Sequence, residues 1–168
     1  MIDNGVMGPS VCSRGGIVPI DGPSPIPRSG RRSATAWEGF HEVLAGGPIR
    51  NLTIRRIRIT ERGITIVEHH LARFGPDRAN EIMVNRLRAI LQGQLKPVDS
   101  DLYFYAHELR EFVRYRRLGW RQGVPPGDAA TDLWRQAHCA TLEEYGLPLP
   151  SDHVLYHPHA QLYLGSEP

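Results

Sequence analysis

Four consecutive segments between Thr60 and Gly146 place apolar residues at helical spacing, and each has its own start and stop signals. A Thr, Asp or Ser residue stands where each segment begins and a glycine follows each one, so the chain can cap each helix and then turn. This succession predicts a mainly α fold, a compact bundle of about four helices. The predicted helices run from Thr60 to about Phe74, from Asp77 to about Leu91, from Asp99 or Ser100 to about Leu118, and from Asp128 to Tyr145.

A small β element is expected beside the bundle. The segment from Leu52 to Thr60 is rich in β-branched residues, and Ile57 and Ile59 alternate with arginines, which favours a short strand. After Pro150 the pattern changes again, and residues 154–156 and 161–164 are predicted to be two short extended pieces.

The N-terminal part of the chain has a different composition. Residues 1–36 are rich in Gly, Pro and Ser and show no sustained hydrophobic period, which predicts a disordered leader or linker. Residues 37–168 are predicted to form a single mainly helical domain. Its first element is expected to be a helical turn over residues 37–44, docked through Trp37, Phe40 and Leu44.

Composition excludes several classes of protein. The longest apolar runs are only a few residues, so no segment is expected to span a bilayer. The N-terminus has no basic start followed by an apolar stretch, so we expect no signal peptide and infer that any export depends on a larger carrier. The two cysteines, Cys12 and Cys139, predict neither a disulfide framework nor a thiolate zinc site.

The basic residues are almost all arginine, although the net charge is only +2. They gather in two stretches, residues 50–62 and 110–121. Arginine forks suit phosphate recognition, whereas a run of charge is also typical of a solvated face. Within the second stretch, Arg110 and Arg117 are the candidate substrate-binding residues, together with Tyr103 and Tyr145, which could stack on a base.

The third predicted helix has two chemically distinct faces. Its apolar side is made of Leu102, Tyr105, Ala106, Leu109 and Val113. The opposite side presents groups that donate, accept or move protons, namely Tyr103, His107, Glu111 and Arg114. This face is either a surface ladder of ion pairs or the lining of a pocket in which His107 acts as general acid or base and Arg114 stabilises an anion.

The same helix offers a metal-binding alternative. Residues 107–111 read His-Glu-Leu-Arg-Glu, which differs from the zinc-hydrolase motif HExxH at its last position. His107 and Glu111 could hold a divalent metal such as zinc with a distant histidine as third ligand, and Glu108 could then act as the base. The principal prediction needs no cofactor.

Two further histidines are candidates for the same site. His138 lies between apolar residues of the fourth helix, so it is expected to face inward or into a cleft, although a hydrogen-bonded core histidine has the same pattern. His157 follows an apolar segment and precedes a proline, which would hold it rigidly. The run Glu68-His69-His70 is interpreted as structural, because His70 borders the apolar stripe of its helix while His69 faces away.

Four segments together resemble the C-terminal toxin domains of bacterial polymorphic toxins, which end long Rhs-repeat and filamentous-haemagglutinin-like carriers. They are GITIVEHHLARFGPDRANEIMVNRLRAILQGQL, FYAHELREFVRYRRLG, AHCATLEEYGL and LYHP, spanning roughly residues 48–160. The resemblance lies in the order and character of these segments, and no short diagnostic motif supports it. It implies secretion within a carrier protein, action in the cytoplasm of a competing cell, and a cognate immunity protein as partner.

The residues and the resemblance together predict an antibacterial effector domain. It is predicted to be a monomeric nuclease whose preferred substrate is RNA rather than DNA. Its catalytic residues are predicted to be His107, Glu111, Arg114, His138 and His157, with the histidines moving protons and the arginine stabilising the phosphorane. The alternatives are the metal-dependent hydrolase built on the third helix and a helical module that binds a protein partner without catalysis.

Overall fold

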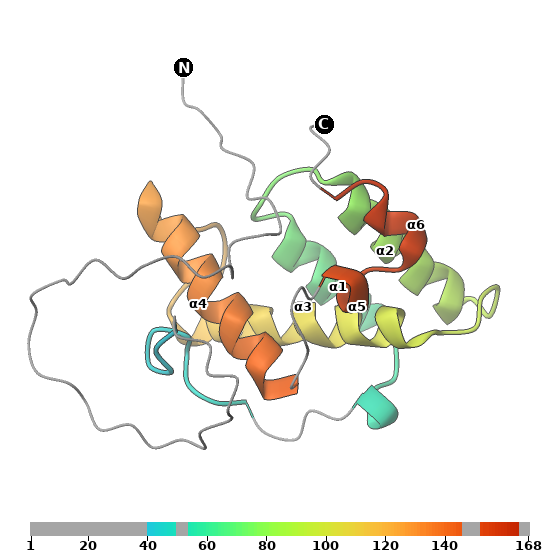
Figure 1. The fold of residues 1–168 in the computed structure, drawn as a ribbon, viewed down its shortest axis with the longest axis horizontal. Helices are drawn as coiled ribbons and strands as arrows, with labels where there is room; N and C mark the ends of the chain where they lie inside the picture. Colours follow the sequence, from blue (N-terminus) through green and yellow to red (C-terminus); the bar gives the residue numbers. More distant parts are fainter. Residues whose placement is uncertain (1–39, 50–53, 146–151, 165–168) are drawn as a thin grey trace, which may run out of the picture.

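The computed structural model describes residues 40–49, 54–145 and 152–164, and their regular structure is entirely helical (Figure 1). The mainly α fold that the sequence predicts is confirmed, with four substantial helices. The elements are the 3₁₀ helix η1 (Ile54–Arg56) and the α-helices α1 (Glu61–Leu71), α2 (Arg78–Leu91), α3 (Asp99–Arg117), α4 (Asp128–Tyr145), α5 (Asp152–Leu155) and α6 (Pro158–Gln161).

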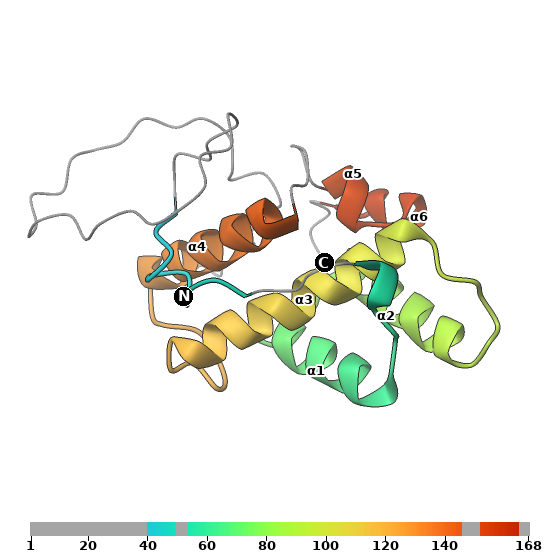
Figure 2. The ribbon, with the colours of Figure 1, turned by 90° about the horizontal axis from the view of Figure 1, so that it is seen from below.

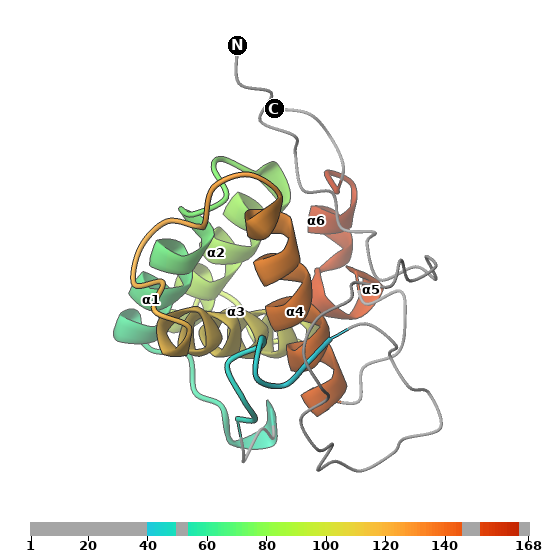
Figure 3. The same ribbon diagram turned by 90° about the vertical axis from the view of Figure 1, so that its left-hand side faces the viewer.

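Helix α3 lies in the middle of the molecule. In Figure 2 it runs between α1 and α2 on one side and α4 and α5 on the other, and it contacts all four of them. The same arrangement is visible nearly along the α3 axis in Figure 3, where α1 and α4 flank that helix. A helix packed on two sides has to bury two faces, and this decides where its polar residues lie.

Helices α1 and α2 begin at the predicted capping residues, whereas the N-cap of α3 is Val98, one residue before the predicted Asp99 or Ser100. The Thr60 side chain accepts a hydrogen bond from Gly63 N, and the Asp77 side chain accepts one from Asn80 N. Each bond satisfies a backbone N–H that has no partner within the first turn of the helix, which typically contributes about 1 kcal/mol. Helix α1 ends at Leu71, three residues before the predicted end at Phe74.

The predicted small β element is wrong for the described residues, which contain no strand. Residues 54–56 form η1 and residues 57–60 are irregular, while the two expected extended pieces contribute to the short helices α5 and α6. A strand needs a neighbouring strand to pair its backbone groups. The described elements around these segments are all helices. The backbone groups of residues 54–56, 152–155 and 158–161 therefore pair within short helices instead.

The segment before η1 differs in detail from the prediction. Residues 42–46 form turns and no regular helix, and Leu44 is 55% exposed whereas Ala45 is fully buried. The docking residue is therefore Ala45, because the turn rotates Leu44 outward. Trp37 and the predicted leader, residues 1–36, lie outside the described residues.

The main hydrophobic core lies where α1, α2 and α3 meet. It contains Ile64, Val67, Met83, Leu87 and Phe104, none more than 1% exposed. Full burial of such side chains contributes about 1.5–3 kcal/mol each, so this core stabilises the packing of α3 against α1 and α2. No helix among the described residues is both long and apolar enough to cross a membrane.

Candidate metal centre

The polar face of α3 is buried. His107 and Glu111 are each 2% exposed and Arg114 is 1% exposed, because α1 and α4 cover this face from the two sides. On the predicted apolar face, Tyr105 and Ala106 are buried, whereas Leu102, Leu109 and Val113 are partly buried. Of the two alternatives for this face, burial argues against the surface ladder of ion pairs, because His107 and Glu111 lie inside the molecule.

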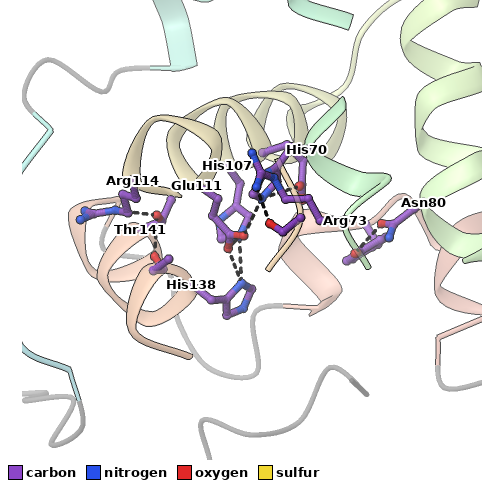
Figure 4. Close-up of polar contacts among 12 residues, drawn as sticks. His70, Arg73, Asn80, His107, Glu111, Arg114, His138 and Thr141 are labelled. Atoms are coloured by element: carbon purple, nitrogen blue, oxygen red, sulfur yellow. Dashed lines mark hydrogen bonds and ion pairs between the residues drawn. The ribbon is translucent and has the colours of Figure 1, made fainter. Parts of the chain in front are cut away.

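Glu111 is the centre of a cluster of three histidines (Figure 4). Its Oε1 lies 2.6 Å from His107 Nε2 and 2.8 Å from His138 Nδ1. Its Oε2 lies 3.1 Å from His70 Nε2. The four side chains come from α1, α3 and α4, so three helices place one nitrogen each against a single carboxylate.

Aromatic packing fixes the histidine rings. Trp134 stacks on His138 with ring centroids 4.7 Å apart and an interplanar angle of 19°. His70 is fully buried, and its ring makes edge contacts with Phe74, Phe112 and Tyr115. Rings held in this way keep their nitrogens aimed at Glu111 without relying on that hydrogen bond alone.

In His70 and His107, the ring nitrogen that does not face Glu111 shows how each ring is oriented. Nδ1 of His70 and Nδ1 of His107 are buried and have no hydrogen-bond partner among the described residues. Both rings therefore make their hydrogen bonds to Glu111 through Nε2. His138 has the most exposed side chain of the cluster, at 14%, so solvent approaches the centre from its side.

The electrostatics favour an ionised Glu111, whereas burial disfavours the charged form of His107. Burial alone would raise the pKa of Glu111, but attraction to His107 and hydrogen bonds from the three histidines outweigh burial and hold the pKa well below its usual value. Burial lowers the pKa of His107, and Glu111 opposes that shift only in part. The neutral imidazole is the form that binds metals.

Glu108 is a second buried carboxyl group next to the cluster. Its Oε2 lies 3.9 Å from His70 Nε2, on the Oε2 side of Glu111. Burial raises the pKa of Glu108 well above its usual value, and the negative charge of Glu111 raises it further. Glu108, considered from sequence as a base, is thus held close to His70.

Three atoms of this cluster form a compact triangle. His107 Nε2 and His138 Nδ1 are 2.9 Å apart, and both lie within 2.8 Å of Glu111 Oε1. If both nitrogens carry protons directed at Oε1, the two N–H groups repel each other. A zinc ion bound at about 2.0–2.1 Å would place its ligand atoms about 3.3 Å apart, so the triangle would need to open by about half an ångström on each edge.

Two of the predicted catalytic residues lie outside this cluster. The guanidinium of Arg114 donates to Thr141 Oγ1 at 3.0 Å and to the carbonyls of Ala45 and Gly47, and it pairs with Glu144 at 2.7 Å. Arg114 therefore connects α3 to α4 and to residues 45–47. His157 lies at the N-terminus of α6, where its side chain accepts a hydrogen bond from His159 N.

The predicted substrate-binding residues have varied positions. Tyr103 packs against the small apolar cluster of Leu142 and Leu155, and Arg110 is partly buried. Arg117 donates hydrogen bonds to the carbonyls of Gly46 and Pro48, so it helps to hold the segment before η1. Tyr145 is the last residue of α4, and its side chain lies outside the described part of the structure.

His70 is the member of the cluster that sequence reasoning left out. It was interpreted as structural because it borders the apolar stripe of α1. The signal that points to it is the same position: a histidine on a buried face needs a polar partner, and the polar face of α3 is the one available. In the comparisons with known proteins, no family model, no curated protein and no solved structure matches this chain.

Proposed function

We propose that this protein is a metal-dependent hydrolase in which His107, Glu111 and His138 hold a divalent metal ion. The observation that supports this most directly is the triangle of His107 Nε2, Glu111 Oε1 and His138 Nδ1, whose edges are all 2.6–2.9 Å. Two imidazoles and one carboxylate form a ligand set typical of catalytic zinc, which leaves a fourth position for water. Of the three ligands, His138 is the most exposed, so we place the water position on its side.

The same triangle argues against a metal-free nuclease with paired histidines. Such an enzyme needs one histidine on each side of the scissile phosphate, but the two facing nitrogens are 2.9 Å apart and leave no space for a phosphate between them. His107 is also 2% exposed, so a polynucleotide could not reach its ring without a rearrangement of α4. A metal ion in the triangle can act on a substrate that stays outside.

The proposed chemistry needs only water as co-reactant. A bound divalent ion lowers the pKa of its water and polarises the oxygen of the substrate. The ion, held by His107, Glu111 and His138, would supply a water activated as nucleophile; that water would add to the electrophilic atom as the bond to the leaving oxygen breaks, and the proton it gives up would pass to that oxygen. The chain's own residues hold the ion and, through Trp134, fix the ring of His138.

We propose nucleic acid as the substrate class. Arg116, Arg117 and Arg121 follow Glu111 closely in sequence, and all three are exposed at or just beyond the C-terminal end of α3. Exposed arginines at this end of α3 would attract a phosphodiester backbone. In this proposal the effector role and the immunity partner suggested by the sequence resemblance are the biological setting.

The test is a cleavage assay on metal-free protein. Protein stripped with a chelator is incubated with total bacterial RNA and with plasmid DNA, alone and after addition of Zn²⁺, Mn²⁺ or Mg²⁺. We expect no cleavage by the stripped protein and recovery with at least one metal. Cleavage that persists in excess chelator and is lost in His107→Ala would overturn the metal mechanism, and absence of both metal binding and cleavage would overturn the proposed function.

A variant at His138 distinguishes loss of metal binding from loss of folding. His138→Asn keeps a hydrogen-bonding group near Glu111 but is a poor metal ligand, so we expect a loss of cleavage of at least about 100-fold with a normal circular dichroism spectrum. The matched control is His159→Ala, because His159 is an exposed histidine of α6. We expect the control to cleave like the wild type.

A further inference from the structure

The carboxylate of Glu111 divides its two oxygens between two groups of ligands. Oε1 faces His107 and His138, whereas Oε2 faces His70. Glu108 belongs to the second group, since its Oε2 lies 3.9 Å from His70 Nε2. Each group brings three potential ligand atoms within 4.8 Å of one another, and Glu111 is the member that they share.

From this arrangement we propose that the centre holds two divalent metal ions, with Glu111 bridging an ion bound by His107 and His138 to a second ion bound by His70 and Glu108. This inference rests on the proposed metal centre at His107, Glu111 and His138. In two-metal hydrolytic sites the ions lie about 3.5–4 Å apart. Mixed imidazole and carboxylate ligands suit zinc, manganese or ferrous iron.

The charge of the cluster supports a second cation. The ion pairs that described residues form with Glu108 and Glu111 all involve histidines, which carry no permanent positive charge at neutral pH. Two carboxyl groups are thus buried with ligand atoms within 4.8 Å of one another, without an arginine or lysine paired to them among the described residues. A divalent ion bound there would compensate the ionised form of Glu108, which burial otherwise disfavours.

The surroundings distinguish the two positions. The His70 ring is enclosed by Phe74, Phe112 and Tyr115 and is fully buried, whereas His138 is 14% exposed. The ion at His70 and Glu108 would therefore be the enclosed one, and the ion at His107 and His138 would be the one that water and substrate reach. We expect the enclosed ion to exchange more slowly with a chelator.

The number of bound ions tests the proposal. The full chain is stripped, reloaded with Mn²⁺, freed of excess metal and measured by elemental analysis, with electron paramagnetic resonance as a second reading. We expect two Mn²⁺ per chain and the multiline spectrum of a coupled pair. We expect Glu108→Gln and His70→Ala to retain one ion with an uncoupled spectrum, while His159→Ala retains two.

The outcomes separate this proposal from the proposed function. One ion in the wild type, unaffected by Glu108→Gln, would overturn the second ion and leave the single-metal hydrolase standing. No bound ion in the wild type would overturn both. Glu108→Gln is the informative variant because it keeps the size of the side chain, so a loss of one ion with unchanged circular dichroism cannot be attributed to a cavity in the core. Two ions in Glu108→Gln and His70→Ala would also contradict the proposal.

Discussion

Arg114 is the largest side chain that this fold buries completely among the described residues. Its guanidinium uses several donors at once, on Thr141, on two backbone carbonyls and on Glu144. A planar fork can satisfy partners in several directions, whereas the single ammonium of lysine cannot. At the scale of one residue, this network is one of the attachments of the segment before η1 to the two longest helices, beside the bonds of Arg117.

We therefore expect Arg114→Lys to destabilise the protein by about 2–4 kcal/mol, because Thr141 and the carbonyls of Ala45 and Gly47 would lose donors while Glu144 would keep only a weaker partner. Urea unfolding followed by circular dichroism measures the change. Arg116→Lys is the matched control, since Arg116 is exposed, and it should change stability by less than about 0.5 kcal/mol. Equal stability of the two variants would contradict this account of Arg114.

The residues of the candidate site could be predicted from sequence only in part. His107 and Glu111 share a helical face, so their proximity follows from a spacing of four residues. His70 and Glu111 are 41 residues apart in sequence, and His138 and Glu111 are 27 apart. Those contacts depend on how α1 and α4 pack against α3, which no local pattern specifies. For the same reason His157 was included although the fold places it at the start of α6.

At the scale of the elements, the contact between α1 and α3 is unusually close at one point. A Cβ added to Gly63 would lie 1.6 Å from the Tyr105 hydroxyl oxygen, which also accepts a hydrogen bond from Thr60 N at 3.3 Å. The glycine thus allows α3 to approach the first turn of α1. This close approach helps to bring His70, which lies seven residues after Gly63 on α1, against Glu111.

Gly63→Ala is expected to destabilise the protein by about 1–3 kcal/mol, although alanine is the better helix former by about 1 kcal/mol. The clash with Tyr105 outweighs the gain in propensity because the ring is buried and cannot move aside freely. Thermal or urea unfolding checks this, with Arg62→Ala as a control on the same turn, where the side chain is exposed. A more stable Gly63→Ala protein would refute the close packing described for this pair.

The elements themselves were largely predictable, and the reasons for the exceptions are physical. Capping residues and glycines set the helix boundaries locally, so the starts at Thr60 and Asp77 agree with the structure. The pattern of α3 left open whether its polar face is exposed or buried, because the helix is covered on two sides and a buried polar cluster has the same spacing as a solvated one. The short β-branched segments were misassigned because a strand depends on a partner elsewhere in the chain.

At the scale of the whole molecule, α4 is held by fewer helices than α1 and α2 are. Among the described elements its backbone lies close only to α3, and Leu142 on its apolar side packs against Leu155 of α5. His138 is the cluster residue on α4, so a metal ion in the proposed centre would connect α4 to α3 directly. Ligands that bind only the folded state stabilise it in proportion to the logarithm of their concentration.

Addition of Zn²⁺ to stripped protein at about 100 times its dissociation constant is therefore expected to stabilise the fold by about 2.7 kcal/mol, a rise of several degrees in melting temperature. Hydrogen exchange should show the largest gain in protection at the amides of α4. His138→Asn should lose the gain in protection at α4 at the same Zn²⁺ concentration. Protection that increases equally in α2 and α4 would argue against a metal acting as the link between α3 and α4.

The position of His138 beyond the loop between α3 and α4 has a consequence for dividing the protein. Residues 118–127 separate it from His70, His107 and Glu111, and Gly123 within that loop is exposed. A single cut there would separate His138 from His107 and Glu111, so only the ion proposed at these three residues would lose a ligand. Binding of that ion would then report reassociation of the two fragments.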